Sequence, residues 1–398
     1  MKPMRAASSL TLRNGQVLAN RIAKAAMSER LGDAEGAPTE GLERLYTRWS
    51  AGGAALLITG NVMIDSAHRG EPHNVVLEDD RHLPAFERWA AAAKQFGSRC
   101  WMQINHPGRQ APRSIDPAPV APSAIPMRGM MGAFRTPRAL TTQEVENTLD
   151  RFARTAELAE RAGFDGVQIH AAHGYLISQF LSPLTNTRED RFGITPENRR
   201  AFLLECVERV RDRTQPGFAV SVKLNSADFQ RGGFDTSDSM AVAEALDAAN
   251  IELLEISGGT YERPEMFEAA KASTRAREAF FLEYATQLRD RYSGHLMLTG
   301  GIRSRTGIRA ALELSKLDVV GLARPLAIEP DLPRRLLDGS AESAIEAGVH
   351  TRFARLDRAL AAPWHELQLH RMAAGEPPDP DLSAFRTLRW YLADHLYG

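Results

Sequence analysis

Cysteine is nearly absent from this sequence, which contains only Cys100 and Cys206 among its 398 residues. Two thiols are too few to hold an iron–sulfur cluster or a zinc ribbon. We expect no structural disulfide between them, because nothing in the sequence points to an oxidising compartment.

Long apolar runs and an excess of charge of either sign are also missing. The N-terminal segment lacks the apolar run of a signal peptide, and nowhere do eighteen apolar residues follow one another. We therefore expect a cytoplasmic protein without a membrane partner. A net charge of −1 creates no long-range field, so we expect no nucleic-acid partner either.

What the sequence does contain is a rhythm of short strand-like runs alternating with amphipathic segments. This alternation predicts a parallel sheet, and eight strands close a (β/α)8 barrel. An open, doubly wound sheet is the competing architecture. The strands are expected at residues 22–27, 54–59, 99–105, 166–170, 219–225, 253–257, 295–299 and 318–322. The helices are expected at residues 40–50, 83–96, 142–162, 196–214, 237–250, 276–291 and 305–314.

Two features favour the closed TIM barrel. No Gly-x-Gly-x-x-Gly follows the first strand, so the usual dinucleotide fingerprint of the open sheet is missing. Because strand side chains alternate between faces, polar groups of four strands point inward near the strand ends. These inward groups are Gln103, Asn105, His170, Lys223, Asn225 and Ser257.

The remaining segments are expected to add to the barrel at both ends. Asn14-Gly15 between apolar residues predicts an N-terminal hairpin. We expect the barrel to occupy residues 1–335, including a long Pro- and Gly-rich loop at 107–137 that is either a lid or a disordered insertion. Residues 336–398, with helices at 341–360 and 384–396, are expected to form a helical C-terminal extension that packs on the barrel or on a partner subunit.

Two glycine-containing strand ends predict a phosphate site. Thr299-Gly300-Gly301 ends the seventh strand and Gly321-Leu322-Ala323-Arg324 ends the eighth. Loops after these strands commonly bind phosphate in barrels, because small residues let backbone N–H groups approach the anion. Arg324 adds a forked, charged donor. The alternative is a tight turn beside a surface arginine.

A second set of residues suits a flat, polar ring. Lys223 points into the barrel, where an unpaired ammonium is costly, so it should meet an anion or an electron-rich heteroatom. The alternative is a buried salt bridge with Glu255 on the neighbouring strand. Gln103 offers a donor and an acceptor, and Ser28 offers a hydroxyl. FMN, a polar heterocycle with a tethered phosphate, would use both sets.

The third cluster is His170, His173 and Tyr175 at the end of the fourth strand. A His-x-x-His pair can bind a metal, but no further ligand recurs at fixed spacing, so we expect no metal. Two neutral imidazoles that donate to one substrate oxygen, with Tyr175 as the proton donor, are the stronger interpretation.

Several motifs together resemble the Old Yellow Enzyme family of FMN-dependent ene reductases and NADH:flavin oxidoreductases. The chain resembles the short form of this family, because it lacks the cysteines of relatives that carry an iron–sulfur cluster. The motifs are LANRIAKAAMSE (18–29), MQINHPGRQ (102–110), HAAHGYLISQFLSPLTNTREDRFG (170–193), VSVKLNSADF (220–229), LTGGIRS (298–304) and GLARPL (321–326).

The resemblance implies a role for each matching residue. Around FMN, Ala25, Ala26, Met27 and Ser28 would line the flavin, Gly60 and Gln103 would lie at its pyrimidine side, Lys223 at N1/O2, and Gly301, Ala323 and Arg324 at the phosphate. His170 and His173 would hold an oxygen of the substrate, and Tyr175 would protonate its α-carbon. Lys223 stands where many relatives have arginine, which replaces a planar fork of donors by a point charge.

We therefore expect an oxidoreductase in which NADH or NADPH reduces bound FMN, which then passes hydride to a small electron-poor substrate such as an activated alkene. A homo-oligomer is possible. Two rival hypotheses are a flavin-binding sensor or scaffold with incidental reductase activity, and a metal-dependent hydrolase built on His170 and His173.

Overall fold

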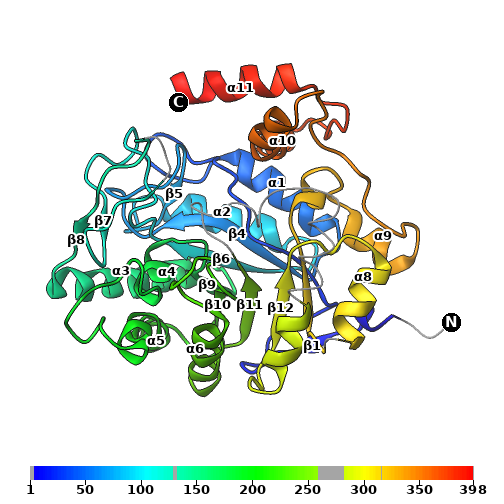
Figure 1. Cartoon of the computed structure of the whole chain (residues 1–398). Helices are drawn as coiled ribbons and strands as arrows, with labels where there is room; N and C mark the ends of the chain where they lie inside the picture. The colour runs from blue at the N-terminus through cyan, green and yellow to red at the C-terminus, as the bar shows by residue number, and fades with distance from the viewer. Residues whose placement is uncertain (1–3, 129–131, 259–281, 315, 398) are drawn as a thin grey trace.

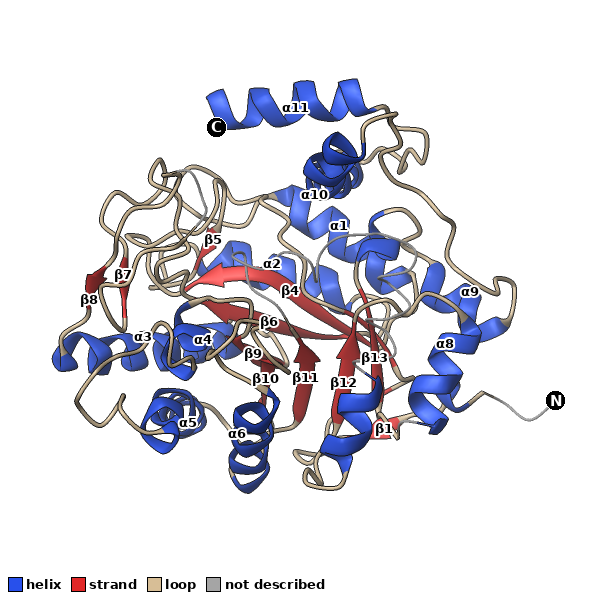
Figure 2. Ribbon diagram, viewed as in Figure 1, coloured by secondary structure: helices blue, strands red, loops and turns tan. Residues whose placement is uncertain are grey.

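The computed structural model describes residues 4–128, 132–258, 282–314 and 316–397. Eight parallel strands form a closed ring, because β3 pairs with both β13 and β4. The predicted (β/α)8 barrel is confirmed (Figure 2). Its strands are β3 (Ile22–Lys24), β4 (Leu56–Met63), β6 (Arg99–Asn105), β9 (Gly166–Ala171), β10 (Ala219–Asn225), β11 (Leu253–Ser257), β12 (Leu296–Thr299) and β13 (Val319–Leu322), with β5 (Val75–Val76) added to β4.

Helices surround the ring of strands (Figure 1). Two of them begin with a capping box, at Thr141 with Glu144 and at Asp235 with Asp238, so their starts follow directly from the sequence. Of the helix expected at 276–291, residues 282–289 are helical and 276–281 lie outside the described residues. The helices are α1 (Glu40–Ala51), α2 (Leu83–Lys94), α3 (Thr142–Arg161), α4 (Leu176–Leu181), α5 (Pro196–Arg213), α6 (Thr236–Ala248) and α8 (Arg305–Arg309), which continues into the π-helix η3 (Ala310–Leu314).

The predicted N-terminal hairpin is present and closes one end of the barrel. Strands β1 (Leu10–Thr11) and β2 (Val17–Leu18) pair antiparallel around Gly15, whose φ is +86°. Their side chains join an apolar cluster with the first residues of the barrel strands, so the amino-terminal end of the barrel is filled and the carboxyl end is left for a site. The cluster includes Leu10, Leu12, Leu18, Leu56, Ala219, Leu253 and Val319.

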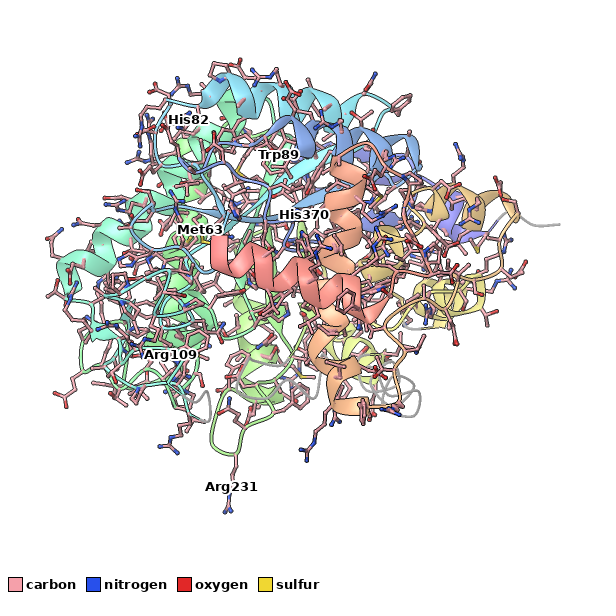
Figure 3. The ribbon with its side chains drawn as sticks, turned by 90° about the horizontal axis from the view of Figure 1, so that it is seen from above. Met63, His82, Trp89, Arg109, Arg231 and His370 are labelled. Carbon is pink, nitrogen blue, oxygen red and sulfur yellow. The ribbon has the colours of Figure 1, made fainter. Side chains whose placement is uncertain are left out.

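The C-terminal part is helical but begins its long helix later than expected. Helix α9 (Leu332–Asp338) is followed by irregular chain, then by α10 (Ala354–Ala373) and α11 (Ala384–Tyr397), so the helix expected at 341–360 is wrong for residues 341–353. The irregular part is held by polar contacts instead, since Ile345 N donates to the Glu329 carboxylate at 2.7 Å. Helix α10 packs on α1, and α11 crosses α10 when the molecule is seen from above (Figure 3).

The long loop at 107–137 is an irregular, hydrogen-bonded arm in its described part. Arg109 donates from Nη1 to the carbonyl oxygens of Ile125 at 3.3 Å and Pro126 at 3.0 Å. Strands β7 (Val120–Ala121) and β8 (Arg138–Ala139) pair at its base. Among the described helices, none has the length and apolar character needed to cross a membrane.

Candidate active site

The barrel interior turns polar toward the carboxyl ends of the strands. Gln103 Nε2 donates to Gln168 Oε1 at 2.7 Å, and Gln168 Nε2 donates to Glu255 Oε2 at 2.8 Å. Lys223 Nζ lies 3.0 Å from Glu255 Oε1, so the salt bridge weighed as the alternative for Lys223 is present. Glu255 is fully buried, so its carboxylate needs the opposite charge that Lys223 supplies. Together these contacts form a polar chain across the interior.

His170 lies directly above this chain as a neutral hydrogen-bond donor. The backbone N–H of Ala172 donates to His170 Nδ1 at 3.2 Å, which leaves the ring hydrogen of the neutral form on Nε2. Burial lowers the pKa of His170 well below its ordinary value, and His173 and Lys223 lower it further. The side chain therefore offers an uncharged N–H near neutral pH.

His173 is fixed at both its backbone and its ring. Its φ of +62° is unusual for a non-glycine residue, and Asn225 Oδ1 accepts from its backbone N–H at 3.1 Å. The ring Nε2 lies 2.7 Å from Ser257 Oγ, at the end of β11. Burial, followed by the charge of Lys223, lowers the pKa of His173 well below its ordinary value. His173 is therefore also neutral near neutral pH.

Tyr175 faces His170 from the turn that starts α4. Its ring centroid lies 4.8 Å from that of His170, with the planes at 78°, and the His170 and His173 centroids are 5.1 Å apart. Asn61 Nδ2 donates to the Tyr175 hydroxyl oxygen at 3.5 Å. The predicted cluster of three proton-active side chains thus forms one compact group, with a phenol beside two neutral imidazoles.

Asp228, which the sequence did not single out, supports this cluster from behind. Its Oδ1 accepts from Asn225 Nδ2 at 3.0 Å, and Asn225 in turn holds the backbone of His173. Burial raises the pKa of Asp228 to about 6, although hydrogen bonds from Asn225 and Ser182 favour the ionised form. The support of His173 therefore contains a group that titrates near neutral pH.

A buried ion pair fixes the segment that follows β3. Lys24 is 0% exposed, and its Nζ donates to Glu29 Oε1 at 2.8 Å, to the Tyr46 hydroxyl at 3.0 Å and to the carbonyl of Ile58 at 2.8 Å. Glu29 Oε2 accepts from the backbone N–H of Gly60 at 3.0 Å. The Lys24–Glu29 pair thus joins the ends of β3 and β4 around the residues proposed to line a flavin.

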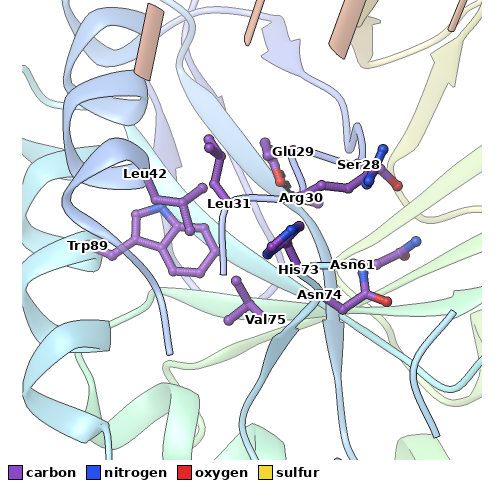
Figure 4. Close-up of a pocket in the computed structure, with 11 residues that line it drawn as sticks. Ser28, Glu29, Arg30, Leu31, Leu42, Asn61, His73, Asn74, Val75 and Trp89 are labelled. Atoms are coloured by element: carbon purple, nitrogen blue, oxygen red, sulfur yellow. Dashed lines mark hydrogen bonds between the residues drawn. The ribbon is translucent and has the colours of Figure 1, made fainter. Parts of the chain in front are cut away.

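Sequence reasoning missed this pair, although strand alternation contained the signal. Ile22 and Lys24 share one face of β3, and Ile22 belongs to the core between barrel and helices. A lysine on such a face requires a buried acceptor, and Glu29 follows five residues later. Figure 4 shows Glu29 and Ser28 lining a small cavity with Asn61, from β4.

The same segment is held by the C-terminal helix α10. His370 Nε2 lies 3.0 Å from the carbonyl oxygen of Glu29, and Arg30 Nη1 lies 3.1 Å from Glu366 Oε2. His370 also packs its ring against Trp390 of α11, with centroids 4.9 Å apart. The C-terminal helices therefore contact the chain directly beside Ser28.

The ends of β12 and β13 form a cradle with the properties of a phosphate site. Gly300 and Gly301 have φ values of +135° and +76°, a backbone that favours glycine and can turn N–H groups toward an anion. A Cβ atom at Gly321 would lie 2.0 Å from Thr299 Oγ1. That hydroxyl, although buried, has no hydrogen-bond partner within the described chain. The cradle fits the phosphate of FMN.

The predicted site residues all lie in the carboxyl-terminal halves of the barrel strands or in the segments that follow them. Ala25, Ala26, Met27 and Ser28 follow β3, Gly60 lies in β4, Gln103 in β6, His170 in β9, Lys223 in β10, Gly301 after β12, and Ala323 and Arg324 after β13. His173 and Tyr175 lie in the turn between β9 and α4.

A second group of titratable residues lies under the long loop. Asp65, His68 and His106 bring their polar atoms within 4.8 Å of one another. His68 Nδ1 pairs with Asp116 Oδ2 at 2.6 Å, and Arg151 lies 3.3 Å from Asp65. Because the Arg151 cation already occupies the carboxylate, this group is better explained as a tether of the loop than as a cation site.

Comparisons with known proteins agree with this geometry. Residues 9–342 match the NADH:flavin oxidoreductase / NADH oxidase family. The chain is 36% identical over 361 residues to the NADH-dependent flavin oxidoreductase iccE of Talaromyces variabilis, covering 85% of this chain and 87% of the relative.

Two solved structures are similar in fold and sequence. The Old Yellow Enzyme homologue from Zymomonas mobilis has a TM-score of 0.72 at 26% identity, over 85% of this chain and 94% of that chain. Morphinone reductase in complex with tetrahydroNAD has a TM-score of 0.70 at 27% identity, over 86% of this chain and 92% of that chain. The chain therefore belongs to the NADH:flavin oxidoreductase / NADH oxidase family, with Old Yellow Enzyme homologues as structural neighbours, and is an FMN-dependent oxidoreductase that uses NAD(P)H.

Proposed function

We propose that the protein is a ping-pong ene reductase whose single cavity at the barrel mouth receives NAD(P)H and then an electron-poor alkene. The observation that carries this proposal is the group of His170, His173 and Tyr175, in which the neutral His170 ring lies 5.1 Å from the neutral His173 ring and 4.8 Å from the Tyr175 phenol, between centroids. When bound, FMN would supply the chemistry of hydride transfer between NAD(P)H and the β-carbon of the alkene.

In this proposal the two histidines polarise the substrate. His170 donates its Nε2–H to the carbonyl or nitro oxygen of the substrate, and the ring of His173 donates to the same oxygen. Negative charge develops on that oxygen as the hydride arrives, and fixed donors in a buried site stabilise it without solvent reorganisation. The lowered pKa values of both rings support this role, since each ring stays uncharged and keeps one N–H to donate.

Tyr175 completes the addition by protonating the α-carbon. Its O–H bond breaks as the new C–H bond forms, and the phenolate is reprotonated by solvent. The contact from Asn61 Nδ2 supports this step, because a donor to the phenol oxygen stabilises the phenolate that is left behind.

The assignment of residues to FMN is also a proposal. Ala25, Ala26, Met27 and Ser28 would line the ring, Gly60 and Gln103 its pyrimidine edge, Lys223 the N1/O2 region, and Gly301, Ala323 and Arg324 the phosphate. The unpartnered Thr299 hydroxyl and the tight approach at Gly321 support the phosphate end. The Lys223–Glu255 pair supports a lysine that is fixed in position before FMN arrives.

We also propose a cytoplasmic location, a division between the barrel (1–335) and a C-terminal extension (336–398), and a homo-oligomer. Free, buried Cys100 and Cys206 support a reducing compartment.

The exposed apolar side chains Phe385, Leu388 and Leu392 on α11 support self-association. Sedimentation analysis tests the oligomer, and a monomer at all concentrations would refute it.

Replacing Tyr175 by Phe tests the proposed reaction. We expect the oxidative half-reaction with 2-cyclohexenone to slow by roughly 10²- to 10⁴-fold, the range for loss of a general acid. The reductive half-reaction with NADH should stay close to wild type, because it needs no proton from Tyr175. Anaerobic stopped-flow absorbance of the flavin measures both half-reactions.

A matched control is available at the opposite end of the barrel. Tyr292, before β12, is 1% exposed, and its hydroxyl has no partner within the described residues. Tyr292→Phe should leave both half-reactions unchanged. Equal slowing of both half-reactions in Tyr175→Phe would remove the proton-donor role from Tyr175.

A further inference from the structure

His173 is held in one orientation by three separate segments at the barrel mouth. Asn225 Oδ1 accepts from its backbone N–H at 3.1 Å, and Gln110 Nε2 donates to its backbone carbonyl at 3.0 Å. The ring Nε2 lies 2.7 Å from Ser257 Oγ. Because the backbone is held on both sides at a φ of +62°, the contact with Ser257 fixes the direction of the ring.

Ser257 itself belongs to the rigid part of the barrel. It is the last residue of β11 and is 8% exposed. In the pairing of β10 with β11 it lies opposite Asn225. Two neighbouring strand ends therefore hold the same histidine, Asn225 by its backbone and Ser257 by its ring, and strand ends position a side chain more precisely than loops do.

The buried Ser257 hydroxyl needs an acceptor for its own hydrogen. A hydroxyl both donates and accepts, whereas each nitrogen of a neutral imidazole does only one of the two. Among the described residues, His173 Nε2 is the one hydrogen-bond partner of this hydroxyl. If Nε2 carried the ring hydrogen, Ser257 would accept it and its own O–H would lack an acceptor, which is rare for a buried group. The hydrogen bond therefore runs from Ser257 to His173.

The direction of this hydrogen bond decides which nitrogen of His173 carries hydrogen. Burial lowers the pKa of His173, so the neutral ring has one N–H. With Nε2 accepting from Ser257, that hydrogen lies on Nδ1. His170 has the opposite arrangement, because the Ala172 N–H donates to its Nδ1 and leaves the hydrogen on Nε2. The two adjacent rings thus differ in tautomer, and each keeps one donor.

We propose that Ser257 is a positioning residue that holds His173 as the Nδ1–H tautomer, so that this N–H and the Nε2–H of His170 donate to one ligand oxygen. The inference rests on the proposed function, in which that oxygen gains negative charge as the hydride arrives. In the other tautomer His173 would present the lone pair of Nδ1 to the oxygen and oppose the developing charge. Ser257 acts only through His173.

Nitrogen NMR measures the tautomer directly, because protonated and unprotonated imidazole nitrogens resonate at well-separated frequencies. The oxidised, FMN-loaded enzyme is labelled with nitrogen-15 in histidine, and His173→Gln identifies the signals of His173 by their loss. At neutral pH we expect the hydrogen of wild-type His173 on Nδ1. Ser257→Ala should shift the population toward Nε2–H, whereas Ser257→Thr, which keeps the hydroxyl, should retain the wild-type tautomer.

A matched control and a second readout separate this role from a general loss of structure. Ser221 on β10 is 0% exposed, and its hydroxyl has no partner within the described residues, so Ser221→Ala should change neither readout. The second readout is the dissociation constant of 2-cyclohexenone from the oxidised enzyme, measured by flavin absorbance. We expect it to rise roughly tenfold in Ser257→Ala, the range for losing one hydrogen bond, and to stay near wild type in Ser257→Thr.

A wild-type His173 with its hydrogen on Nε2 would overturn the proposal. So would a Ser257→Ala variant that retains the Nδ1–H tautomer. If the alanine variant does not load with FMN, Ser257→Cys, which has a weaker donor of similar size, repeats the comparison and should also shift the population toward Nε2–H. Failure of 2-cyclohexenone to reoxidise the NADH-reduced wild-type flavin would instead refute the proposed function, and the tautomer of His173 would still be measured in the oxidised enzyme.

Discussion

Replacing Asp228 by Asn should stabilise the protein at high pH and much less at low pH. Asp228 is 4% exposed, and its burial raises the pKa of the carboxyl to about 6 from an ordinary value of 3.8. The folded state therefore holds the proton more tightly than the unfolded state. Below pH 3.8 the carboxyl does not lower the free energy of unfolding. The loss of unfolding free energy grows as the pH rises above 3.8, and it stops growing once the pH exceeds about 6.

The size of the effect follows from the two pKa values. A rise from 3.8 to about 6 corresponds to about 3 kcal/mol of unfolding free energy once the group is ionised in both states. Asparagine has no charge to desolvate and keeps an oxygen that accepts from Asn225 Nδ2. We expect Asp228→Asn to gain about 3 kcal/mol near pH 8 and about half of that near pH 5.

Denaturant unfolding of the FMN-loaded enzyme at both pH values, with free FMN in excess, measures this difference. Asp212→Asn, an exposed change on α5 with the same loss of charge, is the matched control and should show no such dependence. An equal effect of Asp228→Asn at both pH values would refute the argument. Loss of stability near pH 8 would refute it as well.

Two further predictions concern the segment after β3. Lys24→Met should cost about 3–5 kcal/mol of unfolding free energy, because it leaves the Glu29 carboxylate buried without its cation, and adding Glu29→Gln should recover part of the loss. Denaturant unfolding measures both; no recovery in the double variant would contradict the pairing. Gly60→Ala should lower the FMN content of the purified protein, since its Cβ would lie 2.0 Å from Glu29 Oε2 and 2.2 Å from the Met27 carbonyl. The flavin-to-protein absorbance ratio measures this, and an unchanged ratio would contradict the expectation.

Local patterning was enough to predict most of the barrel. The bounds of β6, β10 and β11 agree with the expected strands, because each is a short run of alternating residues between helical segments. Strand β4 runs on to Met63, beyond the expected end at residue 59. The pairing with β6 shifts register between Ile58 and Asn61, where Glu29 binds the Gly60 backbone, and such a long-range contact leaves no local signal.

The site was predictable where its residues are adjacent in sequence, and less so where they meet only in space. His170, His173 and Tyr175 lie within six residues, so their cluster was visible in the sequence. Asp228 was not, because its role depends on the bond to Asn225 and on burial by the folded chain. The late start of α10 has the same origin, since the contact of Ile345 with Glu329 overrides local helix preference.

The central claim is that the hydride comes from the reductant and that the proton comes from solvent by way of Tyr175. The most direct measurement is the position of hydrogen isotopes in the product of 2-cyclohexenone reduction by unlabelled NADH in D2O. We predict that the flavin bleaches with NADH and recolours with the enone, and that the product carries a deuteron from solvent at the α-carbon. A flavin that NADH does not bleach would contradict this account. So would a product that lacks deuterium at the α-carbon when it is analysed before its α-hydrogens exchange with the solvent.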